Sequence, residues 1–137
     1  MKSLQTLLKV AQRRMDELGI EAVRLGQHVD QLRMQEAAIL AREETEVAIA
    51  SNDPAMASML PAYRARVKAQ VAEARRQIGE KEGQLAEVRT LLNEAYREKS
   101  KFEQLIAQEA IRVATERAAK EQAMLDEVAI NRAGAAD

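Results

Sequence analysis

The apolar residues at the start of the chain recur in alternating steps of four and three. The first seam residues are Leu4, Leu8, Ala11, Met15, Leu18, Ala22, Leu25, Val29 and Leu32. Two helices pack along such a seam when apolar residues repeat every 3.5 residues on average. The seam continues as Glu36, Ile39, Glu43, Glu46 and Ala50, so glutamates take three of its later core positions. The pattern predicts a long coiled-coil helix whose packing weakens towards residue 50.

The helical pattern is interrupted by the stretch SNDPAMASMLPAY, which contains both prolines of the chain. Proline lacks a backbone N–H and restricts the residue before it, so Asn-Asp-Pro ends a helix. Asp53 followed by Pro54 also suits an N-cap and the first position of a short new helix. Pro61 then either kinks that helix or starts the next one. We expect a first helix over about residues 3–51 and a break over about residues 52–61.

A second seam follows the break. One heptad position holds Val71, Ile78, Leu85, Leu92, Lys99, Ile106 and Val113, and the other holds Ala74, Lys81, Val88, Ala95, Phe102 and Glu109. Two long helices with one break predict an all-α fold, namely a long antiparallel two-helix coiled coil, or α-hairpin. We expect the second helix over about residues 62–132, a short tail at 133–137, and a single coiled-coil domain over 1–137.

The charges on either side of the break suit this hairpin. The acidic stretch EETE at 43–46 precedes the break, and Arg64, Arg66 and Lys68 follow it at a similar separation. Flanking positions of coiled coils often pair opposite charges between helices. Folding the chain back should therefore bring the acidic stretch against the basic one.

The two predicted helices differ in length, so the second one overhangs. If the chain folds back near residue 56, Leu4 lies opposite residue 108 or so, and roughly 25 residues of the second helix have no partner. The apolar residues of this overhang are Ile111, Val113, Ala114, Ala118, Met124, Leu125, Val128 and Ile130. An isolated helix of that length is marginal in water. The overhang is therefore expected to be either frayed or held by another protein.

Composition supports long helices and excludes several function classes. Ala, Leu, Glu, Gln, Arg and Lys dominate, whereas Phe occurs once, Tyr twice and Trp never, which disfavours a thick globular core. The net charge of −1 comes without long blocks of one sign, which argues against nucleic-acid binding. With no cysteine, no disulfide framework is expected. No apolar run resembles a secretory signal or approaches the ~20 residues of a membrane span, so we expect a cytoplasmic chain without direct membrane insertion.

The residue pattern contains no constellation for catalysis, cofactor binding or metal binding. His28 is the single histidine and should flank the seam in solvent, so no serine has a plausible base. The seam glutamates lack the Glu-x-x-His pattern of helix-bundle metal sites. Phosphate-binding glycine loops are missing too. We therefore expect a protein that is not an enzyme.

Some positions leave two readings open. Ile20, Val23 and Met34 should point away from the seam, either as scattered exposed apolar residues or as a partner-binding patch. Gly26 and Gly83 either mark a bend or are tolerated in a strong helix. Tyr63, beside the turn, either packs at the edge of the core or contacts a partner, and it is the best interface candidate of the three aromatic residues.

Three stretches in this order and spacing resemble the flagellar FliJ family over nearly the whole chain. They are SLQTLLKVAQRRMDE (residues 3–17), AYREKSKFEQL (95–105) after the proline-containing break, and KEQAMLDEVAINR (120–132). Within the last, Leu125, Asp126, Glu127 and Ala129 are similar to the C-terminal signature of the family. These are small proteins of the flagellar type III export apparatus.

The resemblance implies a stalk or adaptor at the cytoplasmic face of the inner membrane, at the flagellar base. Its implied partners are the flagellar export ATPase, the cytosolic domain of the export gate, and export chaperones. Contact with the ATPase is carried over to Leu125, Asp126, Glu127 and Ala129. Contact with the gate is carried over to Gln35, Ile39 and Tyr63, although AREETEVAI (41–49) departs from the aromatic residues expected late in the first helix.

Alternatives remain open at this point. The chain could be the equivalent stalk of an injectisome or of a rotary ATPase. It could also be a generic coiled-coil dimerisation scaffold in which the seams pair between chains, whereas the hairpin predicts a monomer on its own.

Overall fold

The computed structural model describes residues 2–136, and the side chains of residues 2–135. It contains three helices in this range: α1 (Lys2–Ala50), α2 (Pro54–Ala57) and α3 (Leu60–Ala136). The fold is all-α, as predicted, and residues 2–136 include no strand. The chain divides into two units, which we name the turn unit (Asp16–Asn93) and the terminal unit (Met1–Met15 with Glu94–Asp137).

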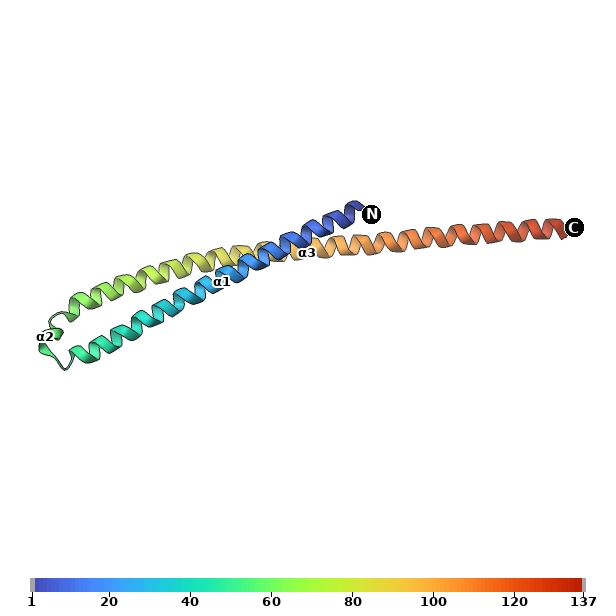
Figure 1. Cartoon of the computed structure of the whole chain (residues 1–137). Helices are drawn as coiled ribbons and strands as arrows, with labels where there is room; N and C mark the ends of the chain where they lie inside the picture. Colours follow the sequence, from blue (N-terminus) through green and yellow to red (C-terminus); the bar gives the residue numbers. More distant parts are fainter. Residues whose placement is uncertain (1, 137) are drawn as a thin grey trace. The chain divides into compact units, whose positions relative to one another are not determined.

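In the turn unit, α1 leads into a tight connection and α3 runs back antiparallel to it, with α2 at the connection (Figure 1). Its core follows the predicted seams. The buried residues are Leu25, Val29 and Ala50 of α1, and Val67, Val71, Ala74, Ile78 and Leu85 of α3. The predicted antiparallel pairing of two seams is thereby confirmed for this unit.

The connection is built from polar caps, as its sequence indicates. The side chains of Ser51 and Asn52 donate hydrogen bonds to the carbonyl of Ala48, at 2.7 and 3.4 Å, and so satisfy the end of α1. The Asp53 carboxylate accepts a hydrogen bond from the Ala55 N–H at 3.0 Å, with Pro54 in the first turn of α2. This confirms Asp53 as an N-cap.

The helix bounds differ from those expected near the prolines and at the C-terminal end. A proline in the first turn of a helix loses no hydrogen bond, because the N–H there has no partner within the helix. Pro54 and Pro61 both occupy such positions, so α2 fits within the expected break and α3 begins at Leu60. At its other end, α3 continues to Ala136, beyond the expected residue 132.

In the terminal unit, the N-terminal part of α1 packs on part of α3. Ala11 and Ala95 are buried, and a further set of seam residues is half-buried: Leu4, Leu8, Met15, Phe102, Ile106 and Glu109. All predicted seam positions up to Glu109 are buried or half-buried, in both units. The predicted heptad register is therefore confirmed to that residue. Val113 is exposed, so the prediction that it belongs to the seam was wrong. The described part of α1 does not extend far enough along α3 to cover Val113.

Candidate interaction surfaces

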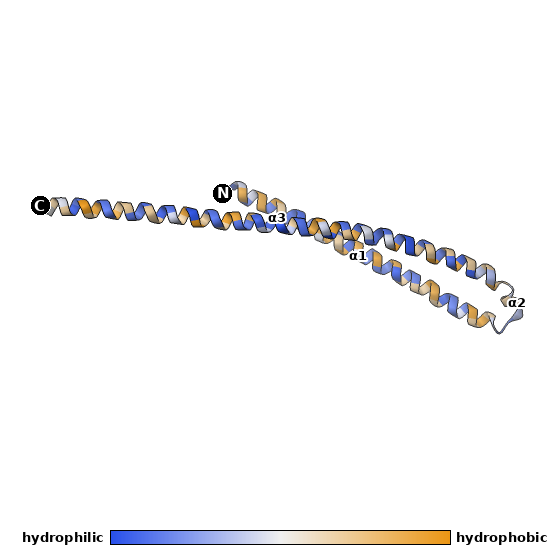
Figure 2. Ribbon diagram, turned by 180° about the vertical axis from the view of Figure 1, so that it is seen from behind, coloured by the Kyte–Doolittle hydropathy of each residue, from blue (hydrophilic) through white to orange (hydrophobic). Residues whose placement is uncertain are grey.

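The first candidate surface is the last part of α3. Every residue from 111 to 135 is exposed. Large apolar side chains are among them, namely Ile111, Val113, Met124, Leu125, Val128 and Ile130, and Figure 2 shows hydrophobic residues interspersed with hydrophilic ones along this stretch. We name residues 111–135 the unpaired section of α3, and it corresponds to the predicted overhang.

The unpaired section carries a shallow hollow of about 370 Å³, lined by Glu121, Met124, Leu125 and Val128. Positions three and four apart share one face of a helix, so these side chains lie together. Glu121, Met124 and Val128 were not singled out as contact residues from the sequence. Their spacing of three, four and seven residues was the signal that could have identified them.

The residues expected to contact the ATPase are all exposed on the unpaired section. Leu125 and Ala129 are one helical turn apart and share a face, whereas Glu127 points to a different side because two residues turn the helix by ~200°. The Asp126 carboxylate accepts a hydrogen bond from the Gln122 amide at 3.0 Å. The structure therefore groups Leu125 and Ala129 with Val128, whereas Glu127, three residues from Met124, lies beside Met124 on the other side of this face.

The second candidate surface lies beside the turn, where the seam contains carboxylates. Glu36, Glu43 and Glu46 are half-buried at core positions of α1. Glu36 forms an ion pair with Arg75 of α3, whose Nε lies 2.7 Å from Oε1 of Glu36, and Arg33 pairs with Glu82 nearby. The two cross-helix ion pairs of residues 2–136 thus lie away from the turn.

The acidic stretch 43–46 lies beside the basic residues after the turn, as predicted, but without an ion pair between them. Glu43 lines a hollow of about 500 Å³ together with Arg64 and Lys68. However, no ion pair within the described residues joins the two stretches. The charged groups of Glu43, Arg64 and Lys68 therefore line the same hollow without forming an ion pair.

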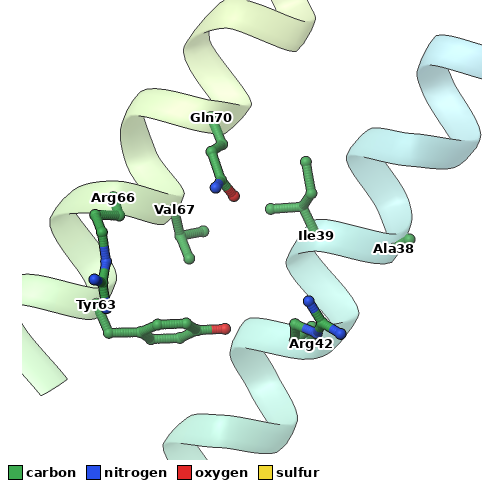
Figure 3. A pocket seen from close by; sticks show the side chains of 7 residues that line it. All are labelled: Ala38, Ile39, Arg42, Tyr63, Arg66, Val67 and Gln70. Atoms are coloured by element: carbon green, nitrogen blue, oxygen red, sulfur yellow. The ribbon is translucent and has the colours of Figure 1, made fainter.

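A groove of about 640 Å³ lies on the turn unit between α1 and α3, and we name it the Tyr63 groove. It is lined by Ala38, Ile39 and Arg42 of α1 and by Tyr63, Arg66, Val67 and Gln70 of α3. Figure 3 shows the Tyr63 ring reaching from α3 towards α1, with Ile39, Val67 and Gln70 pointing into the space between the helices.

The hydroxyl group of Tyr63 is buried and has no hydrogen-bond partner. Leaving a buried polar group unpaired costs about 1–3 kcal/mol, so such a group in a native fold requires an explanation. Of the residues expected to contact the gate, Ile39 and Tyr63 both line this groove, whereas Gln35 is exposed one turn along α1 and is not part of the lining.

The remaining singled-out residues lie on the surface. Ile20, Val23 and Met34 are exposed on α1, as expected for positions that point away from the seam. His28 is exposed, and residues 2–136 hold no cluster of histidine and carboxylate side chains that could bind a metal ion. None of the helices within this range is both long and apolar enough to cross a membrane.

These features define an all-α coiled-coil protein with an exposed helical section and a groove beside its turn. Comparison with protein families matches residues 1–136 to the family described as Flagellar FliJ protein. The chain therefore belongs to the flagellar FliJ family, whose members are non-enzymatic components of the flagellar export apparatus. Comparison with curated proteins finds no match, and neither does comparison with solved structures.

Proposed function

We propose that the chain is a stalk or adaptor of the flagellar export apparatus that binds the export ATPase ring and stimulates it. The observation that carries the proposal is the unpaired section of α3, because all of residues 111–135 are exposed. A helix of this length gains most of its stability from packing an apolar face against a partner. The exposed Leu125, Val128 and Met124 supply such a face.

Binding could stimulate the ATPase by favouring its assembled ring. A ligand that binds one state in preference to another shifts the population towards that state by its difference in affinity. In this proposal, Leu125 and Ala129 make the apolar contact, and Asp126 and Glu127 contact flanking subunit surfaces. The chain itself needs no catalytic residue for this role.

The test is ATP hydrolysis by the cognate flagellar export ATPase, titrated with the full chain and with a version that ends at Val113. We expect stimulation by the full chain and none by the truncated version, while helix content per residue stays similar. A full-length Met34→Gln variant, altered on the exposed outer face of α1, is the control and should stimulate normally. Equal stimulation by the truncated version would contradict the proposal.

We further propose that Ile39 and Tyr63, with Gln35 at the margin, contact the cytosolic domain of the export gate. Support comes from family membership and from the Tyr63 groove, where the buried hydroxyl has no hydrogen-bond partner among the described residues. Tyr63→Ala should weaken binding to the gate domain and leave ATPase stimulation nearly unchanged. The reverse result would mean that the two contacts are exchanged.

Location and assembly follow from these contacts. We propose a cytoplasmic protein held at the inner membrane, at the flagellar base, by its partners, with a role in handling export chaperones. Because the seam side chains are covered within one chain, we propose a monomer in isolation. Sedimentation at increasing concentration should show a constant mass, whereas a concentration-dependent dimer would favour a dimerisation scaffold.

A further inference from the structure

The Tyr63 groove differs from the neighbouring hollows of the turn unit in its charge. The hollow on Lys68 contains Glu43, and the hollow that Met56 and Met59 line contains Glu46. The Tyr63 groove contains Arg42 and Arg66 but no carboxylate in its lining. Of these three sites it is the one whose lining has positive charge alone, and two of its lining residues, Tyr63 and Arg66, also line the hollow that contains Glu46.

The two arginines are available for a partner. Both are exposed, and within residues 2–136 neither forms an ion pair or a side-chain hydrogen bond with a carboxylate. A guanidinium presents a planar set of N–H donors that fits a carboxylate in two parallel hydrogen bonds. A groove with two such groups and no acidic residue is complementary to a negatively charged ligand.

The floor of the groove is apolar. Val67 is buried and Ile39 is half-buried, and the two side chains point into the space between α1 and α3 (Figure 3). The Tyr63 hydroxyl, buried and unpaired, closes one end of this floor. An occupant with an apolar face would cover this floor.

We propose that the Tyr63 groove binds an amphipathic helix of a partner protein that carries carboxylate side chains beside its apolar face. The apolar face packs on Ile39 and Val67, and the carboxylates accept hydrogen bonds from Arg42 and Arg66. A third helix seated along two others completes a small bundle, which is a common way for an amphipathic helix to bury its apolar stripe.

This inference deepens the proposed gate contact, since Ile39 and Tyr63 belong to both, and it rests on that proposal only for the identity of the partner. The binding chemistry can be tested without the gate. Three 18-residue helical peptides with one shared leucine face, flanked by glutamate, glutamine or lysine, are titrated into the full chain labelled with ¹⁵N. The glutamate peptide should bind at least tenfold tighter than the other two and shift amide signals of residues 38–42 and 63–70.

Variants of the chain identify the groups responsible. The double variant Arg42→Gln with Arg66→Gln should bind the glutamate peptide at least tenfold more weakly. It should fold normally, because both side chains are exposed. The matched control, Arg89→Gln with Arg97→Gln, removes two other exposed arginines and should bind normally. Tyr63→Phe keeps the ring and should bind normally, because the hydroxyl that it removes is buried.

Each other outcome counts against the inference. Equal binding of the three peptides, binding of none, signal shifts confined to residues 111–135, or unchanged binding by the Arg42 and Arg66 double variant would overturn it. The two proposals remain distinguishable in a parallel titration with the gate domain. Loss of gate binding in Tyr63→Ala but not in the arginine double variant would keep the gate contact and reject the carboxylate site. Selective binding of the glutamate peptide, with gate binding unchanged in Tyr63→Ala, would keep the carboxylate site and reject the gate contact.

Discussion

The two parts of α3 carry similar residues but differ in what covers them. Up to Glu109, its seam side chains are buried or half-buried against α1 within each unit, whereas residues 111–135 are all exposed. Leu85 in the first part and Leu125 in the second are the same residue type on the same helix, one buried and the other 64% exposed. Formation of a helix and burial of its apolar side chains against a second helix are therefore separate properties. The sequence of α3 supports one continuous helix, and the extent of α1 along it decides which side chains are buried.

The largest effect should come from a charge in the paired seam. Leu25 is 1% exposed, so Leu25→Asp both empties its site and buries a carboxylate. We expect a loss of at least about 3 kcal/mol in the free energy of unfolding, from lost burial and desolvation together. Val23→Asp is the matched control two residues away, at a side chain that is 61% exposed. Thermal unfolding followed by circular dichroism measures both, and equal stability of the two variants would refute the seam register.

The same charge in the unpaired section should leave the fold intact and affect binding instead. Leu125→Asp should change the free energy of unfolding by no more than about 0.5 kcal/mol, as is usual for exposed positions. It should weaken binding to the export ATPase about tenfold, equivalent to ~1.4 kcal/mol. Val23→Asp, which adds the same charge at an exposed position of α1, is the control for binding. A large drop in thermal stability for Leu125→Asp would mean that this section is packed in solution.

Replacing a glycine with alanine should stabilise the paired helices but not the unpaired section. A Cβ at Gly26 would meet nothing within 4 Å, and no glycine in the described range has a positive φ. Gly26→Ala should therefore stabilise the paired part by about 1 kcal/mol, through the higher helix propensity of alanine. Gly134→Ala, in the unpaired section, meets equally open space and should leave the unfolding midpoint unchanged. A loss of stability in Gly26→Ala would favour the reading of this glycine as a bend.

The smallest expected effect concerns pH. Hydrogen bonds from Arg76 and then from Gln77 lower the pKa of Glu73 from 4.5 to about 2. A carboxyl group whose pKa is lower in the folded state stabilises the fold above its unfolded pKa and loses that contribution as the pH falls through the folded value. Glu73→Gln should therefore slightly lower the unfolding midpoint at pH 7, and this difference should shrink as the pH falls from about 4.5 towards 2. Glu87→Gln, which removes a carboxylate without an ion pair in the described residues, should behave like the original chain at pH 7.

Most of the fold could be predicted because a coiled coil is specified by local spacing. The steps of four and three identified the seam residues from Leu4 to Glu109, and Asp53 with Pro54 identified the start of α2. Val113 was misassigned because a heptad pattern cannot show where the partner helix ends. The helix lengths did show it, since they predicted an overhang of the correct extent.

The surfaces were less predictable, because they depend on how far apart the helices lie. The lack of ion pairs between residues 43–46 and Arg64 or Lys68 could not be foreseen from opposite charges at matching distances from the turn. The buried Tyr63 hydroxyl and the placing of Arg42 and Arg66 along one groove depend on side chains from both helices. By contrast, the hollow at Leu125 is lined by residues of one helix alone. The spacing of these residues in the sequence was therefore enough to predict that they share a face.

Hydrogen exchange of the full chain, measured alone and with the cognate export ATPase bound, tests the central claim most directly. Alone, the amides of residues 111–135 should exchange much faster than those of residues 78–92, because they lack a packed partner. With the ATPase bound, residues 111–135 should become strongly protected. Unchanged exchange in residues 111–135 on binding, or protection confined to residues around the turn, would contradict the role of the unpaired section as the ATPase contact.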